Sequence, residues 1–149
     1  MKKMNNKGFS LVELIVVIAI MAVLIGVLAP QFMKYVEKSR ESTDIQNLDT
    51  CVSAVRTYYA DKDTVPDSIT ISAAKGSALK ITGDGADQTP LTDAGCASST
   101  VKGDWGDDGI SAEIDMTSGA VTYAGTAKYY TADTDKGFVA VTPTPAAGG

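Results

Sequence analysis

Residues Gly8 to Glu13 read GFSLVE, and the apolar run Leu14 to Ala29 follows them without interruption. Phe9 to Ala29 comprises 21 residues, which as an α-helix measure about 31 Å, enough to cross the ~30 Å hydrocarbon core of a membrane. The run has no polar face, so it needs apolar surroundings on every side. The stretch therefore predicts a helix that is held in a membrane or packed among other helices.

The charges before the apolar run predict its orientation. Lys2, Lys3 and Lys7 precede the run with no acidic residue among them. Positive charge stays on the cytoplasmic side of a membrane, so the remainder of the chain is expected outside. A secretory signal peptide is the first alternative, cut near Ala29, but the run is longer than the usual apolar region of such peptides. An uncleaved signal anchor is the simplest interpretation.

Glu13 is not explained by a simple anchor. A carboxylate in a membrane segment costs about 2.5–3.5 kcal/mol even on insertion scales, so it is usually paired and functional. The alternative is that Glu13, which lies near the cytoplasmic end, extends its carboxylate to the membrane surface. The position of this residue favours a role in recognition or assembly.

At this point the sequence resembles a known family. Lys7-Gly8 followed by Phe9 to Glu13 is similar to the prepilin signal of type IV pilins and the related pseudopilins. The resemblance implies that a membrane peptidase removes the leader 1–8 by cutting between Gly8 and Phe9, and that the same enzyme methylates Phe9. Pro30 also fits, since these helices commonly carry a proline just past the apolar run. The resemblance covers about the first 35 residues.

The resemblance also implies partners and a location. Expected partners are the prepilin peptidase/methyltransferase, the pilus assembly machinery and other copies of the chain in a helical filament. The chain would first span the bacterial cell membrane once, with its N-terminus in the cytoplasm, and then enter an extracellular pilus. In a filament core, the carboxylate of Glu13 would pair with the new amine of Phe9 in a neighbouring subunit. The Phe9 amine of the same chain is the competing partner. Alternatives are a major pseudopilin of a secretion or competence system and a monomeric membrane-anchored binding module; adhesion, motility and DNA uptake stay unresolved.

The helical pattern continues beyond the apolar run. Pro30 removes one backbone hydrogen bond and predicts a kink. Residues 30–62 are then expected to form an amphipathic helical half, with Asp44 outside its apolar stripe. This stripe, which would pack on a sheet, comprises Ile45, Leu48, Val52, Val55 and Tyr59.

The rest of the chain predicts a small antiparallel sheet, and the fold class is α+β. Residues 63–109 form a variable connecting region with short extended pieces at 68–73 and 78–82, and a turn at 83–85. Residues 110–142 form the sheet of three or four strands, in which 110–116 and 121–123 make a hairpin around Thr117-Ser118-Gly119. Further strands are expected at 128–131 and 137–142, followed by a flexible tail, 143–149.

The two cysteines, Cys51 and Cys96, are far apart in the chain and belong to no metal-binding spacing. In an extracellular domain one disulfide is the simplest interpretation, and it would pin the connecting region to the helix. Many pilins instead carry both cysteines near the C-terminus, so no such loop follows from the resemblance. The alternative is two free or intermolecular thiols.

Composition excludes several function classes. The chain of 149 residues has a net charge of −5, and removal of the leader leaves ten basic and 18 acidic side chains. Such a surface argues against direct nucleic-acid binding. The chain has no histidine, which excludes His-dependent catalysis and metal sites, so no enzyme and no catalytic residues are expected. No cofactor is expected, and Asp104, Asp107 and Asp108 form a weak candidate site for Ca²⁺.

Overall fold

The computed structural model describes residues 8–83 and 87–143. Residues 1–7 of the expected leader, residues 84 and 85 of the expected turn and residues 144–149 of the expected tail lie outside the described residues. The chain forms two compact units, Met1–Val36 and Glu37–Gly149.

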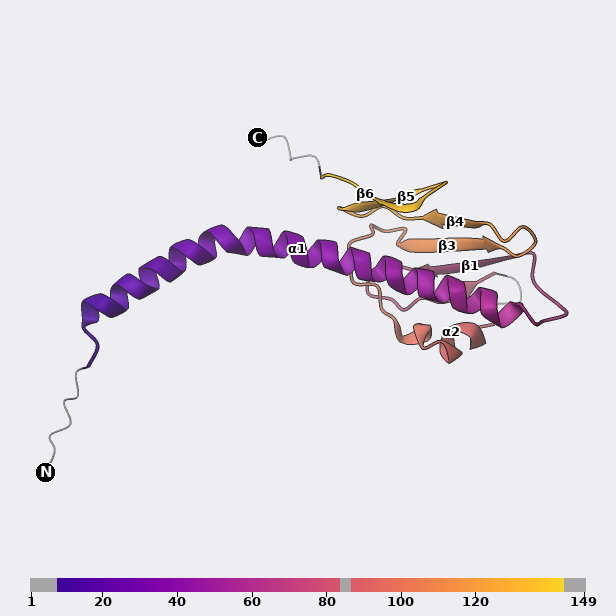
Figure 1. The fold of residues 1–149 in the computed structure, drawn as a ribbon, viewed down its shortest axis with the longest axis horizontal. Coiled ribbons are helices and arrows are strands. Elements are labelled where there is room, and N and C mark those ends of the chain that lie inside the picture. The colour runs from indigo at the N-terminus through magenta and orange to yellow at the C-terminus, as the bar shows by residue number, and fades with distance from the viewer. Residues whose placement is uncertain (1–7, 84–86, 144–149) are drawn as a thin grey trace, which may run out of the picture. The chain divides into compact units, whose positions relative to one another are not determined.

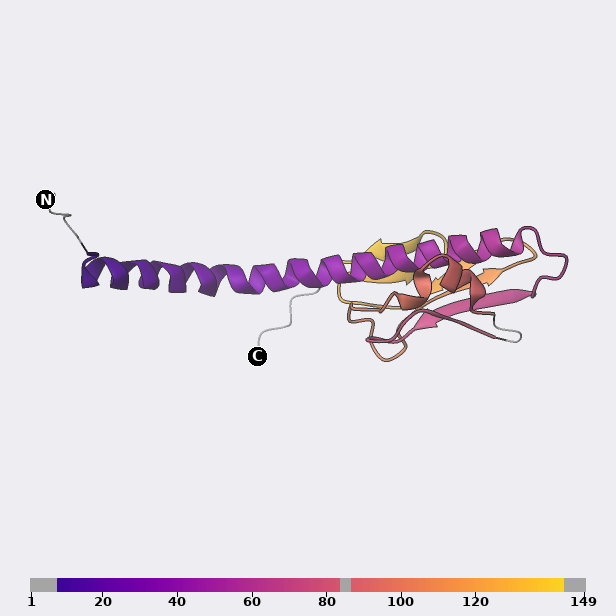
Figure 2. The same ribbon diagram turned by 90° about the horizontal axis from the view of Figure 1, so that it is seen from below.

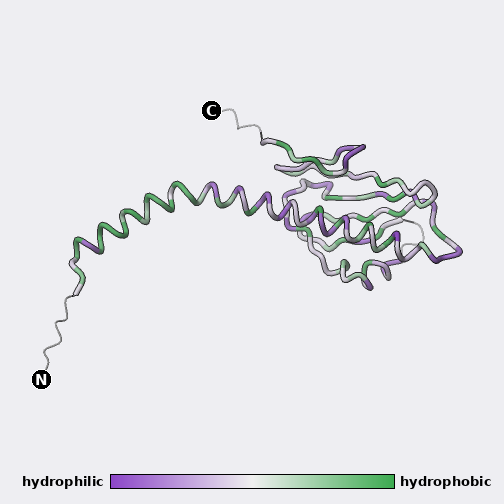
Figure 3. Tube along the Cα trace, viewed as in Figure 1, coloured by the Kyte–Doolittle hydropathy of each residue, from purple (hydrophilic) through white to green (hydrophobic). Residues whose placement is uncertain are grey.

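Helix α1 (Leu11–Tyr59) is the first element, and both units contribute to it. The two expected halves are thus one hydrogen-bonded helix, which continues through Pro30 (Figure 1). Its residues change character as the sequence predicts, from apolar all round to amphipathic (Figure 3). Its buried side chains begin at Glu41 and follow a spacing of three and four residues to Val55.

A four-stranded antiparallel sheet lies beside the second part of α1, in the order β2-β1-β3-β4. The predicted hairpin is confirmed: Ser111 lies opposite Ala124 and Ile114 lies opposite Val121. Asp115 stabilises the turn between them by accepting hydrogen bonds from the amides of Thr117 and Ser118. The α+β fold is therefore as expected, and the strands are β1 (Ser68–Ala73), β2 (Lys80–Thr82), β3 (Ile110–Asp115) and β4 (Val121–Ala124).

Two of these strands come from residues 63–109, where the sequence predicts a connecting region. Strand β1 pairs with β3 over its full length, from Ser68 opposite Asp115 to Ala73 opposite Ile110. The burial of alternate residues in β1 is the pattern of a strand with one face on a core. Hence the sheet extends into the connecting region, and β1 is one of its inner strands.

Strands β5 (Tyr130–Asp133) and β6 (Gly137–Ala140) form a separate antiparallel pair. β5 overlaps the expected strand 128–131 but ends two residues later, and β6 lies within the expected strand 137–142. The pair does not join the four-stranded sheet. The turn between them has Gly137 at a φ of +77°, where a side chain would be strained. Short helices α2 (Thr89–Asp93) and η1 (Cys96–Ser98) complete the unit.

The core of the Glu37–Gly149 unit lies between α1 and one face of the sheet (Figure 2). Trp105 is its largest fully buried side chain and contacts Phe138 edge to face, with 5.2 Å between the ring centres. The strands supply every second residue to this core, as their alternation predicts. The buried apolar residues are Leu48, Cys51, Val52, Val55, Ile69, Ile71, Ala73, Leu79, Ile81, Leu91, Cys96, Val101, Trp105, Ile110, Ala112 and Ile114.

Polar contacts also join α1 to the sheet. The phenol of Tyr123 in β4 donates to Asp49 Oδ1 at 2.9 Å, and Arg56 donates to the carbonyl oxygen of Gly119 in the turn after β3. Burial, together with the Asp49 carboxylate, raises the pKa of Tyr123 to about 12. These contacts fix the β3–β4 hairpin along the last turns of α1.

Candidate functional site

The N-terminus of α1 is closed by a reciprocal pair of hydrogen bonds. The Ser10 amide donates to Glu13 Oε2 at 2.8 Å, and the Val12 amide donates to Ser10 Oγ at 3.4 Å. This is a capping box, which satisfies two amides that a helix start leaves without partners. The spacing Ser-x-x-Glu before an apolar run is the sequence signature of such a box, although the predictions above do not include it.

The capping box gives Glu13 a partner within its own chain. Only Oε2 of the carboxylate accepts a hydrogen bond in the described part of the chain. Because the helix N-terminus is positively polarised, a carboxylate is also favoured at this end. The local contacts therefore lower the cost of placing Glu13 in an apolar segment and leave its second oxygen available.

Gly8 and Phe9 lie just before this helix start and are exposed. Phe9 is 93% exposed, and a methyl group added at Gly8 would meet no atom within 4 Å. The bond between the two residues is thus accessible in the described chain.

The apolar part of α1 has no cover from the residues that the structure describes. Its large side chains, from Leu11 to Leu28, are between 47% and 73% exposed, and they surround the helix on all sides. This is the green stretch of the tube in Figure 3. It is the one helix of the described chain that is long and apolar enough to cross a membrane. Such a surface requires lipid or other protein around it.

Pro30 lies inside α1, four residues after Gly26. Proline has no amide hydrogen, so the Gly26 carbonyl loses the donor that a regular helix would provide. The helix nevertheless continues on both sides of Pro30. Pro30 is therefore placed within the helix and does not end it.

Asp44 corrects an expectation. The sequence places it outside the apolar stripe, but its side chain is only 1% exposed. Oδ2 accepts hydrogen bonds from the Gly103 amide at 2.6 Å and from Trp105 Nε1 at 3.0 Å, and both oxygens face the Lys102 amide. These hydrogen bonds hold the loop before β3 against α1. They also stabilise Asp44, because a buried carboxylate is stable only when it has hydrogen-bond donors.

Glu41 lies one turn earlier and is fully buried. Its Oε2 accepts the Tyr129 amide at 2.8 Å, while Oε1 has no hydrogen-bond partner in the described part of the chain. Burial raises the pKa of the Glu41 carboxyl above its ordinary value, and the nearby charges of Glu37 and Asp104 act in the same direction. The Glu41 carboxylate is therefore less completely satisfied than that of Asp44.

The two cysteines meet in the core. Cys51 on α1 and Cys96 at the start of η1 are both buried, and both are free thiols in this structure. Burial, together with the neighbouring Cys96 thiol, raises the pKa of the Cys51 thiol. The fold thus brings together two residues that are far apart in the chain.

The acidic turn does not assemble a metal site in the described residues. Asp104 forms an ion pair with Lys75 at 2.9 Å, and its amide donates to Glu37 Oε1. No group of three or more Asp, Glu, Cys or His side chains is arranged to hold a metal ion among residues 8–83 and 87–143. The donor set of Asp104, Asp107 and Asp108 gives no support to Ca²⁺ binding.

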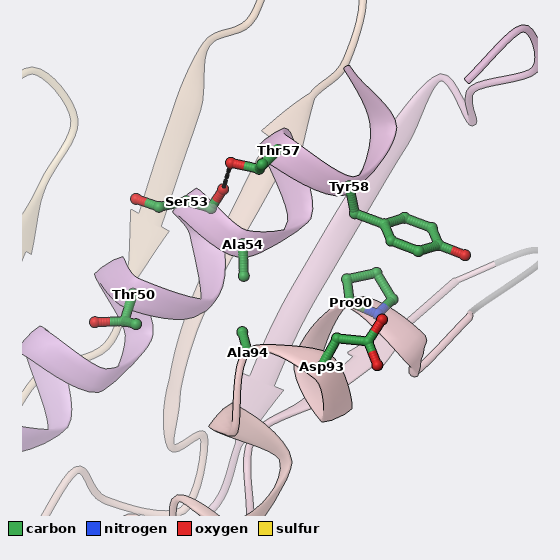
Figure 4. Close-up of a pocket in the computed structure, with 8 residues that line it drawn as sticks. All are labelled: Thr50, Ser53, Ala54, Thr57, Tyr58, Pro90, Asp93 and Ala94. Carbon is green, nitrogen blue, oxygen red and sulfur yellow. Dashed lines mark hydrogen bonds between the residues drawn. The ribbon is translucent and has the colours of Figure 1, made fainter. Parts of the chain in front are cut away.

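A shallow groove of about 450 Å³ runs between α1 and α2 (Figure 4). Small side chains of α1 form one wall, and Pro90 and Asp93 form the other. The hydroxyl of Thr57 donates to the Ser53 carbonyl, so it is already satisfied by its own helix. The groove holds no pairing of a nucleophile with a base. Its lining residues are Thr50, Ser53, Ala54, Thr57, Tyr58, Pro90, Asp93 and Ala94.

Residues 3–29 match the family model described as the prokaryotic N-terminal methylation motif. The match includes Gly8, Phe9 and Glu13 and ends where the apolar run ends. The N-terminal part of the chain is therefore similar to that of type IV pilins.

Curated relatives show the same similarity. The chain is 34% identical over 63 residues to the type IV major pilin protein PilA of Myxococcus xanthus, which covers 42% of the chain and 29% of that relative. It is 36% identical over 83 residues to the fimbrial protein EcpC of Eikenella corrodens, which covers 56% of the chain and 52% of that relative. It is 35% identical over 76 residues to the type IV major pilin protein PilE of Neisseria gonorrhoeae, which covers 50% of the chain and 46% of that relative.

The alignments thus span about half or less of the length of these relatives. No solved structure matches the chain significantly. The family model covers only the N-terminal segment of the chain. The domain that follows is therefore characterised by its structure.

Proposed function

We propose that this chain is a structural subunit of an extracellular type IV pilus, which assembles by the packing of α1 helices. The observation that carries the proposal is the apolar part of α1, exposed on all sides, which begins with a capped carboxylate directly after Gly8. Lipid covers this surface first, and sister helices replace the lipid in the filament. The similarity to proteins named as type IV major pilins supports the same role.

Processing precedes assembly in this proposal. A prepilin peptidase cuts between Gly8 and Phe9 on the cytoplasmic side, where Lys2, Lys3 and Lys7 hold the leader. The new amino group belongs to Phe9, and the same enzyme methylates it. The match to the methylation motif and the exposure of both residues support this step.

Glu13 then sets the register between subunits. One oxygen of its carboxylate caps its own helix at Ser10, and the other receives the positively charged amine of a neighbouring Phe9. The capping box thus stabilises Glu13 while a subunit waits in the membrane. The apolar side chains supply contact area along the whole helix, but the ion pair specifies one alignment.

The experiment compares Glu13→Ala with the wild-type chain in a strain that expresses it. We expect normal membrane insertion and cleavage, with filament yield reduced by more than tenfold. Mass spectrometry of the chain tests processing, because the mature N-terminus should be a methylated Phe9. An intact Met1 or a cut near Ala29 would refute the proposal, and unchanged filament yield would refute the pairing alone.

Electron microscopy of the cell surface separates the two filament classes. Long surface filaments that contain the chain indicate a pilus. A processed chain without surface filaments indicates instead a pseudopilin of a secretion or competence system. Adhesion, motility and DNA uptake are then tested by loss of each activity in a strain lacking the chain.

A further inference from the structure

The core of the Glu37–Gly149 unit contains a pair of thiols that the proposed assembly does not use. Cys51 lies on the buried face of α1, and Cys96 is the first residue of η1. Cys51 is 0% exposed and Cys96 is 3% exposed. Both side chains belong to the same buried core cluster, and the thiol of Cys96 lies near that of Cys51.

The local backbone directs Cys96 toward α1. Gly95 precedes it in the left-handed conformation, at a φ of +72°, which only glycine adopts without strain. The chain thereby turns from α2 into η1 and places Cys96 in the core. Pro90 and Leu91 of α2 are buried beside this turn. The meeting of the thiols is therefore built into the path of the chain.

We propose that Cys51 and Cys96 form a disulfide bond that is made while the domain folds and is sealed from reductants once it has folded. The inference rests on the proposed function for one point, that the domain folds outside the cytoplasm, where disulfides persist. The bond closes the segment 52–95 into a loop that includes β1, β2 and α2.

The reaction is an exchange with an external disulfide, either a protein or a small molecule. The thiolate of one cysteine attacks the donor disulfide, and the first donor thiolate leaves. The thiolate of the second cysteine then attacks the mixed disulfide and releases the second donor sulfur. Two electrons pass to the donor, which is reduced to two thiols and takes up the two protons that Cys51 and Cys96 lose.

Burial determines when this exchange takes place. The attacking species is the thiolate, and burial with the neighbouring thiol raises the pKa of Cys51 far above its ordinary value. The folded domain also excludes a donor from both sulfurs. The bond must therefore form before the core closes, and the same closure afterwards protects it from reduction.

The test uses the full-length chain, purified in detergent from membranes or filaments. The sample is denatured and treated with iodoacetamide, with or without prior reductant, and the added groups are counted by mass spectrometry. We expect no label without reductant and two labels with it. Two labels without reductant would overturn the proposal, as would a dimer that dissociates only on reduction.

The sealed state is tested on the native chain. Reductant followed by iodoacetamide, without denaturant, should leave both cysteines unlabelled in the intact domain. Labelling of the native reduced sample would overturn this part. The same spectra report the N-terminus, so an oxidised chain with intact Met1 would refute the filament and not the disulfide. A processed but fully reduced chain would refute the disulfide and not the filament.

Alanine variants provide an independent readout. Cys51→Ala, Cys96→Ala and the double variant are compared by thermal unfolding. Loss of one disulfide should lower Tm by roughly 10 °C in each single variant, with little further loss in the double variant. If the losses of the single variants instead add in the double variant, the two cysteines act independently and the proposal is wrong.

Discussion

Glu41 and Asp44 are both buried carboxylates on one face of α1, yet their hydrogen bonding differs. Asp44 accepts donors from a loop amide pair and from Trp105, whereas Glu41 keeps one oxygen without a partner in the described part of the chain. A buried acid that lacks donors holds its proton to a higher pH. The folded state therefore favours the protonated form of Glu41.

We predict that Glu41 makes the domain less stable as the pH rises through a defined window. The folded pKa of Glu41 is raised above its ordinary value of 4.5, so the folded state binds more protons than the unfolded state between these two values. The free energy of unfolding falls as pH rises through this window and is constant above it. The variant Glu41→Gln should lack this slope in chemical denaturation followed by the emission of Trp105.

Glu113→Gln provides the control, since Glu113 is exposed on β3. Its curve should run parallel to that of the wild-type chain. Hydrogen bonds lower the pKa values of Asp87 and Asp115, so these carboxylates contribute stability that is lost only as pH falls below about 3.8. This loss is the same in every variant. Parallel curves for Glu41→Gln and the wild-type chain from pH 4.5 upward would contradict the prediction.

Strand β3 begins after a glycine that lies against the end of β1. Gly109 has a φ of +71°, and a methyl group there would overlap the Ala73 carbonyl oxygen and lie 2.9 Å from Ala74 Cα. Gly106 has nearly the same φ, +70°, but open space around it. Substitution of these two glycines therefore distinguishes the cost of backbone strain from the cost of steric overlap.

We predict that Gly109→Ala destabilises the domain by about 3 kcal/mol and that Gly106→Ala costs only about 1 kcal/mol, the ordinary cost of a side chain at positive φ. The excess arises because β1 and β3 must separate to admit the methyl group. Urea denaturation of both variants measures the difference. Equal losses would show that the overlap relaxes without cost.

These elements also show what the sequence could predict. The β3–β4 hairpin follows from alternation and a local turn, and the helix follows from its period. The role of β1 depends on pairing with a strand about 40 residues later, which no local pattern encodes. The residue type of Asp44 predicts a position outside the apolar stripe, although Asp44 shares the spacing of Leu48 and Val55. The capping box has a local signature, Ser-x-x-Glu at Ser10 and Glu13, and can be predicted from the sequence.

The chain as a whole divides into a part with a core and a part without one. Every buried residue of the described chain lies between Glu41 and Tyr129. The apolar part of α1 contributes area that only another molecule can cover. The sequence predicted this division, because it depends on composition, while the partners in the filament depend on surfaces that composition does not specify.

We predict that a chain beginning at Glu37 folds and is soluble without detergent, because it retains all buried residues and loses the exposed apolar helix. Its single tryptophan, Trp105, should keep a blue-shifted emission and unfold cooperatively. Sedimentation should show a monomer, where the full-length chain requires detergent. A red-shifted emission without a transition would show that residues 9–36 are needed for folding.

The polar contacts along α1 have a mechanical consequence. In the proposed filament, a tensile load enters the domain through α1, which is one continuous helix from Leu11 to Tyr59. Glu41, Asp44, Asp49 and Arg56 attach successive turns of this helix to four different stretches of backbone or side chain. A pull along the helix axis strains these attachments together, in shear. The helix therefore cannot be peeled away one contact at a time, and the domain resists extraction better than its few ion pairs suggest.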